Sequence, residues 1–432
     1  MPSTSTTHFH APGTARSRIA FTEFNLPNGL HVILHQDRST PIVAIGVMYH
    51  VGSKDEAPDR RGFAHFFEHL LFEGSANIGR GDYAKYVERA GGVLNANTNG
   101  DRTYYHEVLP SNQLELGLWL ESERMLQARV DRTGIDTQRE VVKEERRQRY
   151  ENQPYGSILP EVLKRAYTVH PYQWPVIGFM EDLDAASEAD FIAFYKTWYV
   201  PGNAVLVLAG DLDVDAATAA VHNYFAGIPT GGVLPRRSIT EPPLNGEIRD
   251  VVMDRIQLPA VVQAYRIPAM NNPDFPAVDM LNRLLSNGNS SRLVKQVKEA
   301  DELALHVGSF SLPFEQPGLA MAFAIANLGV DPERLEAGME REFDRVRTER
   351  VTEAELDKLK VQLEMEHALE YSRMDGLAHN LAHAHTFLGS AHMVNDELQR
   401  WLAVTPEELQ RAARTWFVPS NRVVLHYLPR PA

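Results

Sequence analysis

Two histidines and a glutamate stand in one apolar segment, residues 62–72, with the sequence Gly-Phe-Ala-His-Phe-Phe-Glu-His-Leu-Leu-Phe. On a helix, residues four apart lie on one face, so His65 and His69 can reach one ion, with Glu68 beside them. Neutral imidazoles leave Zn²⁺ a strong Lewis acid, and a carboxylate can take the proton of an activated water. The segment therefore predicts a zinc hydrolase site, with His-x-x-Glu-His in the reverse order of the commoner His-Glu-x-x-His.

The alternative interpretation of residues 62–72 is a buried helix with incidental polar residues. Burying two histidines and a glutamate among four phenylalanines is unfavourable unless these groups find a partner. A bound metal would be such a partner, and we favour that interpretation.

A catalytic zinc keeps one position open, so a third protein ligand is expected on another element. Residues 139–147 form a strongly charged predicted helix, most of whose charges are typical of a solvated face. Ile135, Val141 and Val142 mark its inward stripe. Glu145 lies four residues after Val141 and three after Val142, whereas Glu144 is turned away. Helix geometry therefore favours Glu145 as the third ligand.

Composition excludes several classes of protein. The chain has 432 residues, of which 44% are hydrophobic and 23% charged, and its net charge is −14. Such an acidic chain is not expected to bind nucleic acid, which needs a basic surface. With no cysteine, it has no disulfide, thiolate nucleophile or Cys-ligated zinc. No apolar run reaches the roughly 18 residues of a membrane span.

Residues 1–17 are rich in Ser, Thr and His and lack the apolar core of a signal peptide. We therefore expect a soluble, bacterial-type protein and leave the compartment open between cytoplasm and periplasm.

An internal repeat divides the chain. Residues 197–205 and 415–423 share the pattern Thr-Trp-aromatic-Val-Pro-x-Asn-x-Val, and the helix before each begins with a capping box, at Ser187 and at Thr405. A stretch rich in Gly and Pro separates the copies. We predict an N-terminal domain over residues 20–226 that carries the zinc motif, a linker over 227–246, and a homologous C-terminal domain over 247–432 without the motif.

The expected elements suggest the same fold for each half. Residues 24–34 contain an Asn-Gly turn between apolar runs, which is typical of a hairpin. Further strands are expected at 42–51 and 205–208, and helices at 61–73, 80–91, 111–130 and 134–150. This order predicts an α+β protein made of two homologous α/β-sandwich halves, each a mostly antiparallel sheet with helices packed on it.

Residues 91–105 run Gly-Gly-Val-Leu-Asn-Ala-Asn-Thr-Asn-Gly-Asp-Arg-Thr-Tyr-Tyr. Their small polar side chains suit a plain loop and strand. They also suit an edge strand whose free N–H and C=O groups pair with an extended peptide. The residues alone favour the plain loop and strand.

Taken together, these motifs resemble the pitrilysin/insulinase zinc peptidases, the inverzincins. The resemblance rests on His65 to His69, Glu145, residues 91–105, His170-Pro171-Tyr172 and the Trp-Tyr-x-Pro-x-Asn of residues 198–203. The length is similar to that of the short two-domain bacterial branch and of mitochondrial processing peptidase subunits.

The resemblance implies a role for each site residue. His65, His69 and Glu145 would bind Zn²⁺, and Glu68 would be the catalytic base. Asn95 and Ala96 would lie on an edge strand that holds the substrate backbone. Two such halves or subunits would close like a clam around oligopeptides or unfolded polypeptides.

Three departures from the family pattern affect this prediction. Gln138 stands where many relatives have a Glu, seven residues before the third ligand. Lys298 and Leu305 stand where relatives have a substrate-gripping Arg and Tyr. The second half has Asp279, Asn282 and Arg283 in place of the zinc motif.

The missing Arg and Tyr lead us to expect a partner. We predict a heterodimer in which a homologous subunit without a zinc site supplies both residues; a homodimer is the alternative. Two other functions stay open, a non-catalytic scaffold of the same family and a zinc hydrolase of non-peptide substrates.

Overall fold

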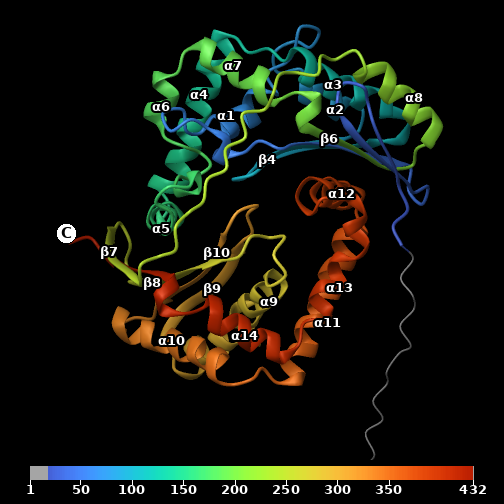
Figure 1. The fold of residues 1–432 in the computed structure, drawn as a ribbon. Coiled ribbons are helices and arrows are strands. Elements are labelled where there is room, and N and C mark those ends of the chain that lie inside the picture. Colours follow the sequence, from blue (N-terminus) through green and yellow to red (C-terminus); the bar gives the residue numbers. More distant parts are fainter. Residues whose placement is uncertain (1–17, 432) are drawn as a thin grey trace, which may run out of the picture.

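The computed structural model describes residues 18–431, in two halves that face each other (Figure 1). Residues 1–17, in which we expect no signal peptide, lie outside the described residues. The fold is of the predicted α+β class, with two sheets and helices packed on them. No helix of the described residues combines the length and the hydropathy that crossing a bilayer requires.

The two sheets share a five-strand topology, to which the first sheet adds β1 at one edge. Strand order is β1-β2-β6-β3-β5-β4 in the first and β7-β11-β8-β10-β9 in the second, and each sheet contains one parallel pair, β2–β6 or β7–β11. The strands of the first sheet are β1 (Thr22–Asn25), β2 (His31–Gln36), β3 (Ile42–Tyr49), β4 (Val93–Thr98), β5 (Thr103–Pro110) and β6 (Ala204–Gly210). Those of the second are β7 (Ile248–Asp254), β8 (Ala260–Ile267), β9 (Ala304–Leu312), β10 (Gly318–Ala326) and β11 (Arg422–Pro429).

Fourteen α-helices accompany these strands in the described chain. The first eight are α1 (Phe63–Leu70), α2 (Tyr83–Arg89), α3 (Leu114–Gln127), α4 (Arg132–Arg146), α5 (Ile158–Ala166), α6 (Met180–Ala185), α7 (Glu188–Trp198) and α8 (Val214–Phe225). The others are α9 (Phe275–Ser286), α10 (Pro332–Thr348), α11 (Glu353–Tyr371), α12 (Met374–Leu388), α13 (Glu397–Leu402) and α14 (Pro406–Trp416). The helices and strands expected in the first half are all present, with ends shifted by a few residues.

The internal repeat predicted from residues 197–205 and 415–423 is confirmed in atomic detail. Asn203 donates a hydrogen bond from Nδ2 to the carbonyl of Trp198 at 2.8 Å, and Asn421 does the same to Trp416 at 2.8 Å. The capping boxes at Ser187 and Thr405 are both formed. Between the sheets, residues 229–244 contain no helix or strand.

The inner face of each sheet is covered by a helix from the other half. Helix α12 lies under the first sheet in Figure 1 and packs Leu377 and Leu381 against Ile33 and Val207. In return, α5 of the first half packs on the second sheet, where Val162 joins the core cluster of that sheet. The sequence predicts helices packed on each sheet but not that one of them comes from the other half. Strands with both faces apolar need cover on both sides.

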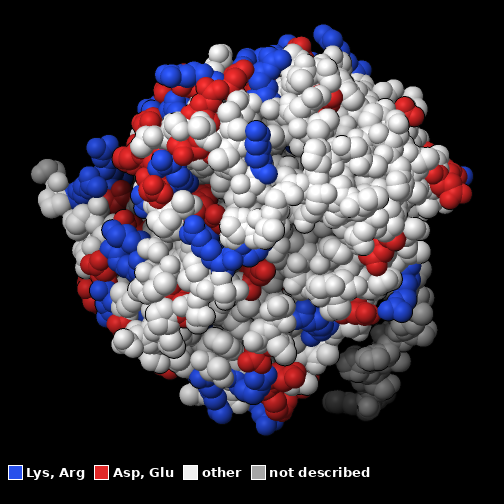
Figure 2. Space-filling view, turned by 45° about the horizontal axis from the view of Figure 1, so that its top comes forward, with Lys and Arg blue, Asp and Glu red and all other residues white. Residues whose placement is uncertain are grey.

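Acidic and basic side chains are interspersed on the face drawn in Figure 2. They gather mainly over the part of the molecule where α4 and α6 lie, and no broad basic field covers this face.

Candidate metal centre

Helix α1 carries His65, Glu68 and His69, and a buried carboxylate fixes where it begins. Gly62, with φ +96°, precedes the helix, and a Cβ at this position would come within 2.7 Å of the Ile177 carbonyl oxygen. The fully buried Glu56 accepts hydrogen bonds from the N–H groups of Gly62 and Ala64, both at 2.8 Å. These bonds satisfy free donors at the positive end of the helix dipole.

The apolar side of α1 anchors it in the first core. Phe63 stacks on Phe191 of α7 with ring centroids 4.5 Å apart, and Phe67 contacts Phe194 at 5.4 Å. At its other side, the Tyr105 hydroxyl donates to the Phe67 carbonyl at 2.8 Å. The phenylalanines that make this segment apolar therefore hold the two histidines in place.

Helix α4 supplies the third group. It begins at a cap in which Asp131 accepts from the Gly134 N–H at 2.8 Å, and it passes directly into a π-helical turn, Arg147–Glu151. The inward stripe predicted for this helix is wrong at Val141, which is 44% exposed. Val142 is fully buried, so Glu145, one turn further on, still faces α1.

Three predicted ligands converge from these two helices. The Glu145 Oε2 atom lies 3.4 Å from His65 Nε2 and 3.3 Å from His69 Nε2. It is buried without a hydrogen-bond partner in the described chain, and so is His65 Nδ1. Ligand atoms around a tetrahedral zinc ion lie about 3.3–3.4 Å apart. The spacing, the orphaned oxygen and the donor set of two imidazoles and a carboxylate therefore fit a zinc ion.

The charges around Glu145 keep it ionised. Burial raises its pKa, but His65, His69 and Arg149 outweigh this and hold the pKa well below its usual range. Arg149 Nη1 lies 3.1 Å from Glu145 Oε1. The adjacent Glu144 is instead about half exposed and accepts a hydrogen bond from Arg147 at 2.9 Å.

Glu68 lies on the same helix and is half-buried, outside the cluster of the three ligand atoms. Burial lowers the pKa of the nearby Arg102 to about 10, although the Glu68 carboxylate favours the charged form of Arg102. Arg102 Nη2 lies 3.3 Å from His379 Nε2 on α12, so two halves of the chain meet beside Glu68. Sequence reasoning missed Arg102 and His379, for which only the three histidines within residues 379–385 gave a signal.

The side chain of Gln138 bonds to Glu73 and not to His65, His69 or Glu145. Its Nε2 donates to Glu73 Oε1 at 2.6 Å, and Glu73 is also paired with Arg80. A hollow of about 580 Å³ lies beside both residues and is lined on another side by Val93, Leu94 and Asn95 of β4.

Strand β4, which holds Asn95 and Ala96, is the edge of the first sheet and packs against α1. Successive residues of β4 direct their backbone N–H and C=O groups alternately toward β5 and away from it. The Asn99 N–H bonds to the Arg102 carbonyl, so the groups of Asn95 face β5 and those of Ala96 face outward. The Ala96 N–H bonds at 2.8 Å to Asn95 Oδ1. The segment that could have been a plain loop and strand is an edge strand, whose outward backbone groups pair with no other strand of the described sheet.

Among the described residues of the second half, 247–431, no comparable cluster occurs. On α9, Arg283 Nε lies 2.9 Å from Asp279 Oδ2, an ion pair at the helix position where α1 has two histidines. Lys298 lies in the π-helical segment Val294–Ala300, and Leu305 is 56% exposed on the edge strand β9.

Comparison with known proteins gives the family. Residues 31–178 match the family model "Insulinase (Peptidase family M16)", and residues 185–363 match "Peptidase M16 inactive domain". The zinc protease PqqE of Helicobacter pylori is 32% identical over 340 residues, which are 78% of this chain and 77% of that protein. An uncharacterized zinc protease of Mycobacterium tuberculosis is 28% identical over 410 residues, 94% of this chain and 92% of the relative. The chain therefore belongs to the M16, or insulinase, family, as its motifs predicted.

Solved structures have the same two-half architecture. A protease from Helicobacter pylori superimposes with a TM-score of 0.91 at 28% identity, over 95% of this chain and all of that one. A peptidase M16 inactive domain from Pseudomonas fluorescens shares the fold, with a TM-score of 0.86 at 19% identity over 96% and 98% of the two chains. The three convergent ligands lie in the part of the chain that matches the insulinase model.

Proposed function

We propose that this chain is the zinc-binding subunit of a metalloendopeptidase that hydrolyses oligopeptides or unfolded polypeptides. The observation that carries the proposal is the convergence of His65, His69 and Glu145 at the spacing of zinc ligands, with an orphaned carboxylate oxygen between the rings. A buried group of this kind is unfavourable unless a cation completes it. Relatives named zinc proteases support the same assignment.

His65, His69 and Glu145 would hold the ion. Zinc bound there would polarise the scissile carbonyl and make water acidic enough to ionise near neutral pH. Glu68, one residue before His69, would accept the proton of the attacking water and deliver it to the leaving amine nitrogen. Its half-buried position leaves it accessible to both.

The substrate would bind as an added strand along β4. The outward N–H and C=O groups of Ala96 would pair with the peptide backbone, after the Asn95 side chain releases the Ala96 N–H. Backbone pairing selects a substrate because it is extended and unfolded, and not because of its amino-acid sequence. The hollow beside Glu73 and Gln138 would accept a side chain of that peptide.

The partner subunit is part of the proposal. Lys298 lacks the planar fork of arginine, and Leu305 has no hydrogen-bond donor. We propose that a homologous subunit without a zinc site supplies an Arg and a Tyr to grip substrate carbonyls, in a heterodimer that encloses the peptide; a homodimer is the alternative.

The test is the Glu68→Gln variant, assayed on quenched fluorescent peptides. Gln has the shape of Glu but cannot take a proton, so turnover should fall by about 10²–10⁴-fold while zinc content and fold stay unchanged. Glu144→Gln, which changes the exposed carboxylate next to Glu145 on α4, is the matched control and should keep full turnover. Undiminished cleavage by Glu68→Gln would remove Glu68 as the base.

Assaying the purified chain alone tests the partner. Full activity of the isolated chain would remove the need for a second subunit. If the chain holds no zinc after gentle purification and cleaves nothing with or without homologous subunits, the non-catalytic scaffold becomes the better assignment.

A further inference from the structure

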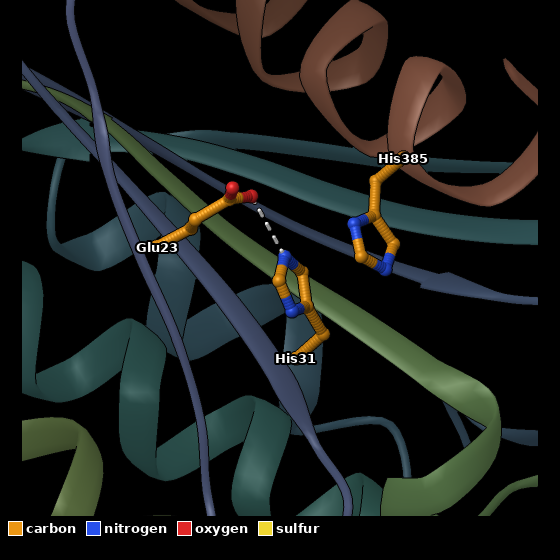
Figure 3. Close-up of side chains that lie close together, drawn as sticks. All are labelled: Glu23, His31 and His385. Carbon is orange, nitrogen blue, oxygen red and sulfur yellow. Dashed lines mark hydrogen bonds and ion pairs between the residues drawn. The ribbon is translucent and has the colours of Figure 1, made fainter. Parts of the chain in front are cut away.

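A second group of possible metal ligands lies where the two halves meet, away from α1 and α4. Glu23 comes from β1, His31 from β2 and His385 from the last turn of α12. Figure 3 shows the carboxylate of Glu23 and both imidazole rings directed toward one another, with the helix of the second half above the strands of the first. The residues belong to segments far apart in the chain, so the group exists only when the halves are assembled.

The atoms of this group are close enough to share an ion. One ligand atom from each of Glu23, His31 and His385 lies within 4.8 Å of the other two, and His31 Nε2 is 3.2 Å from Glu23 Oε2. The two imidazole rings stack with centroids 3.6 Å apart. Zinc ligands are spaced at about 3.4 Å. To reach it, the His385 ring would turn out of the stack, because the in-plane lone pairs of parallel rings do not converge on one point, and the partly exposed Glu23 side chain would rotate inward.

The His31 ring is already arranged as a metal ligand. Its Nδ1 lies 3.0 Å from Asn25 Oδ1, and an N–H donated there leaves the Nε2 lone pair directed at Glu23. Metal-binding histidines usually donate their second ring nitrogen in this way, which fixes the tautomer. The imidazole ring of His385 makes no hydrogen bond within the described chain, so its nitrogen lone pair is available.

The rings are also in the right charge state. Burial lowers the pKa of His31, and burial together with the neighbouring His31 lowers the pKa of His385 to about 4. Two neutral imidazoles and one carboxylate carry a net charge of about −1, which a divalent cation complements. A hollow of about 350 Å³, lined by Asn25, His31 and His385, gives an ion access to the group.

We propose that Glu23, His31 and His385 form a second metal site, which binds a first-row divalent transition ion such as Zn²⁺ and ties the first sheet to α12. Two nitrogen ligands favour such an ion over Mg²⁺ or Ca²⁺, which prefer oxygen. The bound ion would link β1 and β2 of one half to the helix that the other half contributes. This proposal stands independently of the catalytic one.

Metal counting on the full-length chain tests the second site. The chain is stripped with chelator, loaded with Zn²⁺, dialysed and measured for zinc by mass spectrometry. We expect two ions per chain in the wild type and one in His385→Phe, which keeps a stacked ring but has no ligand nitrogen. His306→Ala removes an exposed histidine of β9 and, as the matched control, should keep two.

The His65→Ala/His69→Ala variant separates this site from the catalytic one. It should retain one ion, and zinc should raise its Tm because the ion binds only the folded chain. Adding His385→Phe should abolish both the ion and the shift in Tm. The proposal is overturned if the His65→Ala/His69→Ala variant holds no ion, or if His385→Phe leaves the zinc count and the shift in Tm unchanged. Failure of peptide cleavage with two ions bound would count against the catalytic proposal alone.

Discussion

At the residue scale, Glu144 and Glu145 show how position on a helix decides what a carboxylate can do. They are adjacent, yet Glu144 lies in solvent beside Arg147, whereas Glu145 is held between His65 and His69. The side turned toward α1 is set by Val142, which is fully buried three residues earlier. The two residues therefore form a natural pair for testing the metal ligand.

We predict that Glu145→Gln loses the catalytic zinc and that Glu144→Gln does not. Changes outside the ligand shell already weaken metal binding by about 10–100-fold, so losing a ligand should weaken it by at least about 100-fold. Zinc titration against a chromophoric chelator, in the His385→Phe background, measures the catalytic site by itself. If Glu144→Gln lost the metal while Glu145→Gln kept it, the ligand would be Glu144.

At the element scale, the placement of β4 gives the first sheet an edge that can take another strand. The strand lies at the end of the sheet order and packs against the helix that carries the histidines. Beside the matching edge strand of the second sheet, β9, α9 holds the Asp279–Arg283 ion pair. Within residues 18–431, only the first repeat combines an edge strand with possible ligands on the helix beside it.

We predict that Ala96→Pro weakens substrate binding more than it weakens the fold. Proline removes the outward N–H, which does not bond to β5, so the change should be tolerated as on other edge strands. Losing one net hydrogen bond of about 0.5–1.5 kcal/mol should raise KM by up to about 10-fold. Steady-state kinetics and Tm measure the two effects.

Ala96→Ser keeps the N–H and serves as the control for Ala96→Pro. An unchanged KM in the proline variant would mean that the peptide does not pair with this edge.

At the scale of the whole molecule, polar contacts join the two halves near the end of β4. The buried Asp101 accepts from Lys54 at 2.7 Å, from the Tyr172 hydroxyl, and from the Glu315 N–H at 2.9 Å. Glu315 belongs to the hairpin between β9 and β10 and is also 2.8 Å from His50 Nε2. Residues of the His170-Pro171-Tyr172 motif therefore help to hold the halves together.

We predict that this junction weakens in acid. Burial raises the pKa of Glu315, but His50 and Lys54 outweigh it and lower the pKa to about 2. A carboxyl whose pKa is lowered on folding stabilises the protein above its unfolded value of 4.5, and this contribution is lost as pH falls toward 2. Glu315→Gln should lower Tm at pH 7 and have little effect near pH 2.

Thermal unfolding of wild type and Glu315→Gln across this pH range checks the prediction. The exposed Glu299, changed to Gln, is the control and should not alter the pH dependence. A difference between wild type and Glu315→Gln that is the same at pH 2 and pH 7 would contradict it.

Much of the cluster formed by His65, His69 and Glu145 could be predicted because its parts are local. The spacing of His65 and His69 places both on one face of any helix, and the adjacent Glu144 and Glu145 point about 100° apart around α4. The repeat follows from a short local pattern that recurs in each half, whereas the order of the strands within the sheets was not predicted. Val141 was misplaced because periodicity locates a stripe only to within one residue.

The exchange of α5 and α12 between the halves was decided only by the tertiary structure, and so was the group formed by Glu23, His31 and His385. The amino-acid sequence determines which residues a helix or strand presents on each face. It does not state which distant surface that face will meet, because apolar faces attract without direction and many pairings satisfy the same pattern. Contacts between the halves therefore emerge only when the whole chain is packed.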